Sequence, residues 1–289
     1  MLLSICAPTI MAAPAIVNES ESSVATDKKE LNYVSVGDSM ANGYGFENYK
    51  QDDSNLAVYN PLAADPNNGG VGKDTGLNMY GAGAYPVQFE KYLEDKGYIV
   101  NHTKLATSAM LPEDFLYLLG GRDTEFDDNY DGYRTYVGSY TSHPDFADLV
   151  ADFRALVQKS VTEADVITLG LGNANFGAFL MDKITKALGV LGWSLGEADK
   201  KLTLEYALSE LEEADRDEIV AFVDSYMAGL NIDAVLAEYG FSKEKATDAL
   251  NIVEYTIATF ILNYKLVVEK ILEMNPDVEI IFVGLLNTT

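Results

Sequence analysis

The chain has 289 residues, and its 45 acidic and 20 basic side chains give it a formal net charge of −25. Hydrophobic residues make up 48% of the chain, which is enough to bury a sizeable core and argues against a disordered or fibrous protein. The acidic balance argues against a nucleic-acid partner, because phosphate binding requires clustered Lys and Arg.

One cysteine and two histidines leave few side chains for metal chemistry. Cys6 alone forms neither an internal disulfide nor a thiolate zinc site. We therefore expect no metal and no organic cofactor, and we expect carboxylates and hydroxyls to carry any reaction.

Residues 1–17 contain no charged side chain, and Ala13 and Ala15 place small residues at the spacing that a signal peptidase recognises. This pattern predicts a signal peptide and a secreted protein of the bacterial type, although the first basic residue is only Lys28. The alternative is an apolar N-terminus without a targeting role. No other stretch reaches the roughly 20 apolar residues of a membrane span, so no stable membrane insertion is expected.

The first half of the chain predicts two strands and two helices. Residues 31–36 are rich in β-branched side chains and lead directly into Gly37-Asp38-Ser39, which is typical of a strand followed by a loop. Residues 43–83 predict a long loop. Residues 85–96 predict a helix with Pro86 in its first turn and Gly97 after its last, followed by a strand over residues 98–105 and a short helix from Pro112.

The second half predicts two more strands and a long helical region. After a loop over residues 120–142 and a helix over 145–160, residues 164–171 are apolar on both faces, as in a buried parallel strand. Residues 176–274 predict helices with breaks near 189–196, 231 and 240. The last helix, 251–274, is apolar almost all round and is expected to be buried. A fourth strand at 278–284 completes a parallel α/β sheet.

Ligands of parallel α/β sheets bind at the carboxyl ends of the strands, so the residues directly after each strand are the candidate site. Ser39 follows a buried strand and a glycine that permits close approach, which suits a nucleophile. The backbone N–H groups of Ser39 and Ala109, with an asparagine amide after the third strand, could form an oxyanion hole. The alternative is that Asp38 or Ser39 only caps a helix.

Three segments resemble, in order, the first three sequence blocks of the SGNH or GDSL family of serine ester hydrolases. They are residues 33–45 with Gly37-Asp38-Ser39, residues 105–109, and residues 165–176 with Gly172-Asn173-Ala174-Asn175. The resemblance implies a three-layer α/β/α, flavodoxin-like sheet over residues 31–289, with a helical insertion at about residues 180–250. It also implies that Ser39 is the nucleophile, and that Ser39, Ala109 and an asparagine of the third block donate to the oxyanion.

The chain departs from the family pattern in three places. Ala109 stands where the second block usually has glycine. Alignment on Gly172 puts Ala174 where asparagine is expected, which leaves Asn173 or Asn175 as the donor; we favour Asn173 because it follows the strand end more closely. The fourth block, Asp-x-x-His, which supplies the general base, has no counterpart.

The two histidines of the chain are His102, inside the second predicted strand, and His143, in a loop. We interpret both as structural residues, one on a strand face and one in a loop. The alternative is that either one replaces the missing general base through an unrelated geometry, because triads are defined by geometry and not by order in the chain. The simplest account of the missing block is that one C-terminal strand-and-helix unit is absent from the chain.

These observations predict a secreted serine hydrolase that cleaves small carboxylic esters, of the lipid or acetylated-carbohydrate type, through an acyl-enzyme on Ser39. The helical insertion is expected to fold over the strand ends as a cap. The alternative is a catalytically silent carbohydrate- or lipid-binding remnant of the same fold.

Residues 127–132 resemble the start of a calcium loop, but Gly138 replaces its final glutamate, and a solvated acidic loop is the favoured interpretation. The oligomeric state is left open.

Overall fold

The structure is a computed structural model, and it describes residues 29–42, 83–106, 110–121, 146–197, 199–209, 211, 213–229, 240 and 242–284. The expected signal peptide (1–17), most of the two long loops and the calcium-loop motif (127–132) lie outside these residues. No helix in the described ranges is long and apolar enough to cross a membrane.

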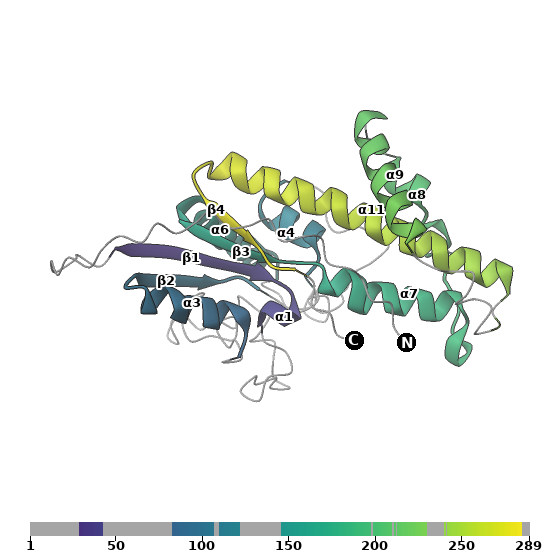
Figure 1. Ribbon diagram of the computed structural model, residues 1–289, viewed down its shortest axis with the longest axis horizontal. Helices are drawn as coiled ribbons and strands as arrows, with labels where there is room; N and C mark the ends of the chain where they lie inside the picture. Colours follow the sequence, from purple (N-terminus) through teal and green to yellow (C-terminus); the bar gives the residue numbers. More distant parts are fainter. Residues whose placement is uncertain are drawn as a thin grey trace.

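The described residues form one parallel sheet of four strands, β1 (Glu30–Gly37), β2 (Ile99–Lys104), β3 (Val166–Gly170) and β4 (Glu279–Phe282). The strands lie in the order β2-β1-β3-β4, and every neighbouring pair is parallel (Figure 1). This confirms the predicted parallel α/β fold. All five residues of β3 are buried, as its apolar sequence predicted, because the strand is central and has helices on both faces.

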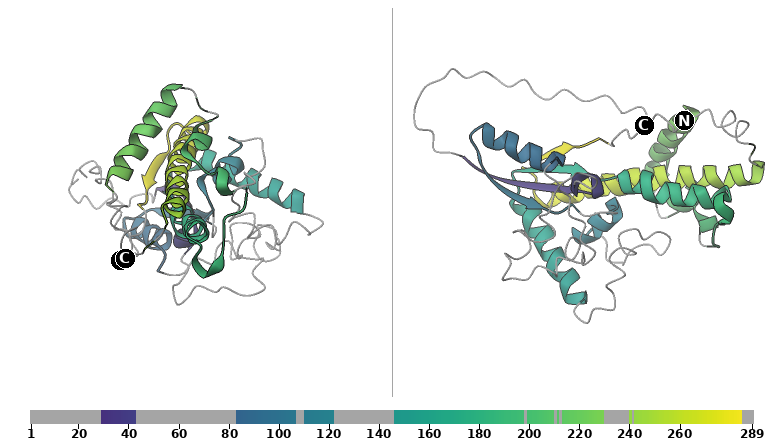
Figure 2. Two further views of the ribbon diagram at one scale, coloured as in Figure 1. Left: turned by 90° about the vertical axis from the view of Figure 1, so that its right-hand side faces the viewer. Right: turned by 90° about the horizontal axis from the view of Figure 1, so that it is seen from below.

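Helices cover the two faces of the sheet and make three layers (Figure 2, right). Helix α3 (Tyr85–Asp95) packs on one face, where Phe89 and Leu93 meet Tyr33 of β1. Three helices cover the other face: α4 (Pro112–Leu118), α6 (Phe146–Glu163) and the second half of α11 (Lys243–Met274).

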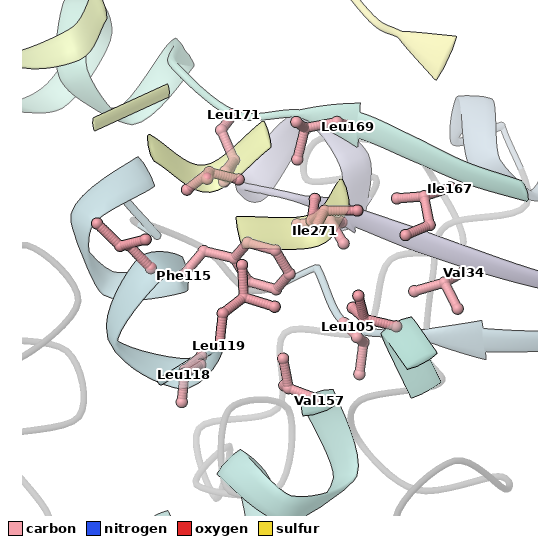
Figure 3. Close-up of a cluster of buried hydrophobic side chains, with 14 of the residues drawn as sticks. Val34, Leu105, Phe115, Leu118, Leu119, Val157, Ile167, Leu169, Leu171 and Ile271 are labelled. Atoms are coloured by element: carbon pink, nitrogen blue, oxygen red, sulfur yellow. The ribbon is translucent and has the colours of Figure 1, made fainter. Parts of the chain in front are cut away.

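The main core lies between these three helices and the sheet (Figure 3). Alternate residues of β1 and β3 point into it, since side chains of a strand alternate between its faces. The labelled core residues are Val34, Leu105, Phe115, Leu118, Leu119, Val157, Ile167, Leu169, Leu171 and Ile271.

The predicted helical insertion forms a helical lobe, which we define as residues 174–229 with the first half of α11. It contains the π-helix η3 (Ala174–Phe179), α7 (Leu180–Ala187), the short turns η4 (Val190–Gly192) and η5 (Asp199–Lys201), α8 (Leu204–Leu208) and α9 (Glu213–Ala228). The lobe extends beyond the carboxyl ends of the strands, along α11 (Figure 1). It therefore lies at the end of the sheet expected for a cap, but it packs on α11 and projects away from the strands.

The last helix differs from its prediction in two respects. It begins at Lys243 instead of residue 251, where Ser242 is the N-cap and its Oγ accepts a hydrogen bond from the Lys245 N–H at 3.4 Å. It also has an exposed face, with Lys265 and Leu266 among its exposed residues, so the expectation of a fully buried helix was wrong. A helix that lies across the outside of two cores needs a buried stripe only.

Candidate functional site at the ends of β1 and β3

The carboxyl ends of β1 and β3 lie side by side, and two of the three predicted site segments follow them. Gly37, the last residue of β1, pairs with Gly170, the last residue of β3. From β1 the chain proceeds to β2 on one side, whereas β3 lies on the other side, so this is the topological switch point of the sheet. Open parallel sheets bind ligands at such points. The third segment, residues 107–109 with Ala109, lies outside the described residues.

Asp38 joins the loops that follow the two strands. Its carboxylate is fully buried; Oδ1 accepts from the Met40 N–H at 3.0 Å, and Oδ2 accepts from the Ala174 N–H at 3.0 Å. The Asn173 side-chain amide donates to Oδ1 at 3.5 Å. Burial raises the pKa of Asp38, and these hydrogen bonds oppose the rise in part.

Ser39 is the first residue of the short helix α1 (Ser39–Asn42) and is half-buried. The glycine before Asp38 is required by the close approach of the chain: a Cβ on Gly37 would overlap the Cβ of Ala41 and lie 2.8 Å from the carbonyl oxygen of Gly170. The sequence predicted that glycine permits a close approach of the chain at this position, and the contacts of Gly37 with Ala41 and Gly170 are such an approach.

The loop after β3 enters a π-helix, a rare element that is frequently found at functional sites. Gly172 has a φ of 123°, a conformation that favours glycine. Asn173 is half-buried and is directed to Asp38, whereas Asn175 is buried, with only 3% of its surface exposed. The Oδ1 atom of Asn175 has no hydrogen-bond partner in the described part of the chain. The sequence predicted a helix here only from Phe176 onward and missed the π-helix.

His102 takes part in a hydrogen-bond network that sequence reasoning missed. Its Nδ1 lies 2.8 Å from Glu90 Oε2 of α3, and its Nε2 lies 2.9 Å from Ser35 Oγ of β1. Its ring stacks on Tyr33, with 4.1 Å between the ring centroids. The alternation of side chains along a strand could have indicated this network, because it places Tyr33 and Ser35 on one face of β1. Tyr33 also pairs with His102 in the sheet.

The order Ser-His-Glu in this network is that of hydrolase triads, but Ser35 is completely buried beneath α3. The interpretation of His102 as a residue on a strand face agrees with this geometry. Burial lowers the pKa of His102, and the hydrogen bond with His102 lowers the pKa of Glu90. The second histidine, His143, lies outside the described residues.

Within the described ranges, no group of three or more His, Cys, Asp or Glu side chains could hold a metal ion. No protein-family model, curated protein or solved structure matches the chain. The fold and the site therefore define a class only: a parallel α/β protein, with helices on both faces of its sheet and a Gly-Asp-Ser loop at the switch point.

Proposed function

We propose that this chain is a serine ester hydrolase of the SGNH type, secreted by way of residues 1–17, with Ser39 as its nucleophile. The observation that carries the proposal is the position of Ser39, half-exposed directly after a buried strand and at the switch point between β1 and β3. The proposed substrates are small carboxylic esters of the lipid or acetylated-carbohydrate type.

In the proposed reaction, Ser39 Oγ attacks the ester carbonyl carbon while its proton passes to a general base. The carbonyl oxygen becomes an oxyanion, which the N–H groups of Ser39 and Ala109 and an asparagine amide stabilise. Departure of the alcohol leaves an acyl-enzyme on Ser39, and water then releases the acid. This chemistry needs no metal or organic cofactor.

Asp38 supports the choice of Asn173 as the amide donor. A side-chain amide has two N–H groups, and the contact with Asp38 Oδ1 uses one of them. The same contact restrains the Asn173 side chain beside the loop that carries Ser39. Asn175, which is buried two residues further along the chain, remains the alternative.

The general base is the part of this mechanism to be tested first. Both ring nitrogens of His102 are engaged, by Glu90 and by Ser35. His143 is the other histidine of the chain. Loss of ester hydrolysis in His143→Ala would identify His143 as the base, whereas unchanged hydrolysis would agree with its interpretation as a structural residue.

Covalent labelling with a fluorophosphonate tests the nucleophile, because this reagent phosphonylates activated serines. We expect one label per chain in the intact-protein mass spectrum, on Ser39 after peptide mapping, together with hydrolysis of nitrophenyl acetate and butyrate. Ser39→Ala should lose both signals, whereas Ser35→Ala and the exposed Ser209→Ala should retain the label. Equal labelling of the wild type and Ser39→Ala would refute the assignment.

A catalytically silent binding protein is the second candidate, and the engagement of His102 away from Ser39 favours it. This candidate predicts no label and no hydrolysis, but a rise in melting temperature with a medium-chain fatty acid or an acetylated oligosaccharide. Ser39→Trp, which fills the site, should abolish that rise. The absence of both labelling and stabilisation would exclude both candidates.

A further inference from the structure

Tyr85, the first residue of α3, lies against the paired ends of β1 and β3. Its hydroxyl donates to the carbonyl oxygen of Val36 at 3.4 Å. A Cβ on Gly170 would overlap the Tyr85 hydroxyl and lie 3.1 Å from its Cζ, and a Cβ on Gly37 would lie 3.3 Å from the same hydroxyl. The two glycines are paired across the strands, so together they leave a slot that the tyrosine occupies.

The residues around Tyr85 connect this slot to the Ser39 helix. A small cluster of Ala41, Ala84 and Ala106 is buried at the start of α3, and Tyr85 and Val87 pack against it. Ala41 belongs to α1, the helix that begins at Ser39. Tyr85 therefore contacts both the strand ends and the cluster that seats α1.

We propose that Tyr85 is the positioning residue of the Ser39 site. Its ring in the slot formed by Gly37 and Gly170 sets the spacing of the loops that follow β1 and β3. This inference rests on the proposed role of Ser39 and assigns Tyr85 no contact with substrate.

An oxyanion hole requires its hydrogen-bond donors to be held precisely where the charge develops. Ser39 belongs to the loop after β1 and Asn173 to the loop after β3, and both loops are bonded to Asp38. A rigid aromatic ring packed against the paired last residues of the two strands limits movement of one loop against the other. A displacement of about 1 Å at such a site lowers a reaction rate by as much as about a hundredfold.

Paired substitutions separate this role from ordinary core packing. Gly170→Ala places a methyl group against the Tyr85 hydroxyl, and Tyr85→Phe removes that hydroxyl. Gly37→Ala instead overlaps Ala41 and the backbone of Gly170, which Tyr85→Phe does not relieve. Tyr92→Phe, on the exposed face of the same helix, is the matched control.

The measurement is the second-order rate of fluorophosphonate labelling of Ser39 in each folded variant. We expect Gly170→Ala to slow labelling by about tenfold or more. Adding Tyr85→Phe to Gly170→Ala should restore most of the rate. Gly37→Ala should stay slow with or without Tyr85→Phe, and Tyr92→Phe should match the wild type.

Hydrogen exchange of residues 36–42 and 170–176 supplies a readout that does not depend on Ser39 chemistry. Gly170→Ala should raise exchange in both segments, and Tyr85→Phe should reverse the rise. If wild-type Ser39 is not labelled, the proposed function fails, and the exchange data alone decide the role of Tyr85. If Tyr85→Phe rescues Gly170→Ala in neither measurement, the slot does not position the two loops.

Discussion

At the scale of single residues, Asp38 determines how the two loops of the candidate site meet. Burial raises its pKa, so the folded protein binds a proton at Asp38 more tightly than the unfolded chain does. The stability that arises from this difference is present at acidic pH and is lost as the pH rises through the raised pKa. Ionisation of Asp38 therefore lowers the stability of the folded protein, and the hydrogen bonds of the carboxylate to both loops offset part of this loss.

Asp38→Asn tests this description. The amide has one oxygen and places an NH₂ group against the N–H of Met40 or of Ala174, so we expect a loss of about 1–3 kcal/mol in the free energy of unfolding. Only the wild type titrates at this position. The difference in the free energy of unfolding between the wild type and Asp38→Asn should therefore grow as the pH falls from neutral to mildly acidic. Urea unfolding at several pH values measures both effects.

The control for this experiment is Asp165→Asn, since exposed Asp165 also accepts a backbone N–H, from Asn32 at 2.8 Å. This variant measures how much stability is lost when such a hydrogen bond is removed at an exposed position. A wild-type advantage over Asp38→Asn that shrinks on acidification would contradict the raised pKa.

At the scale of elements, α3 is held on the sheet by a polar contact inside an aromatic cluster. Phe89 meets the Tyr33 ring edge-on, with 5.2 Å between centroids, and Glu90 bonds His102. The pKa values of His102 and Glu90 are both lowered in the folded protein. Each group therefore contributes stability above its ordinary pKa, which is lost as the pH falls.

His102→Phe keeps an aromatic ring beside Tyr33 but leaves Glu90 and buried Ser35 without the imidazole. We expect it to lower the free energy of unfolding by about 1–3 kcal/mol at neutral pH. The difference from the wild type should decrease as the pH falls through the ordinary range of histidine, and denaturant titrations can measure it. Glu94→Gln removes an exposed carboxylate of the same helix and serves as the control. A difference that stays constant with pH would contradict the lowered pKa of His102.

At the scale of the whole molecule, α11 connects two cores. Ile252 and Tyr255 belong to the core of the helical lobe, whereas Val267 and Ile271 belong to the main core between the sheet and α4, α6 and α11. The lobe also contains an ion pair between buried Lys183 of α7 and partly buried Asp199 of η5. The two halves of the molecule thus have separate cores that share one helix.

Leucine-to-alanine substitutions in the two cores should change hydrogen exchange in different parts of the molecule. Leu202→Ala in the lobe and Leu105→Ala in the sheet core each leave a cavity, which costs about 2–5 kcal/mol. Leu202→Ala should raise hydrogen exchange in residues 180–208 and leave β3 protected, because proteins open in local cooperative units. Leu105→Ala should raise exchange in the strands. Equal acceleration of both regions by Leu202→Ala would show that the two cores open together.

Much of the sheet was predictable because its signals are local. The apolar run of β3, the β-branched residues of β1, and Pro86 and Gly97 at the ends of α3 all act on their own segment of chain. The start of α11 was predicted too late because residues 243–250 are mostly polar or small. They lie in the helical lobe, where the neighbouring helices determine which of them are buried.

The partners of the site residues could not be read from the chain. Asp38 meets Ala174, His102 meets Ser35, and Tyr85 lies against Gly170. Each pair is far apart in sequence, and hydrogen-bonding capacity alone does not select a partner. The choice depends on the strand order, which places β2 on one side of β1 and β3 on the other.

The elements, the parallel sheet and the position of Ser39 after the first strand could be predicted from the residues, because periodicity, turn residues and glycine act locally. Which carboxylate joins the two loops, what His102 contacts and where the helical region packs became known only from the folded chain. These features depend on the long-range pairing of strands and on burial, and both arise only when distant parts of the chain come together.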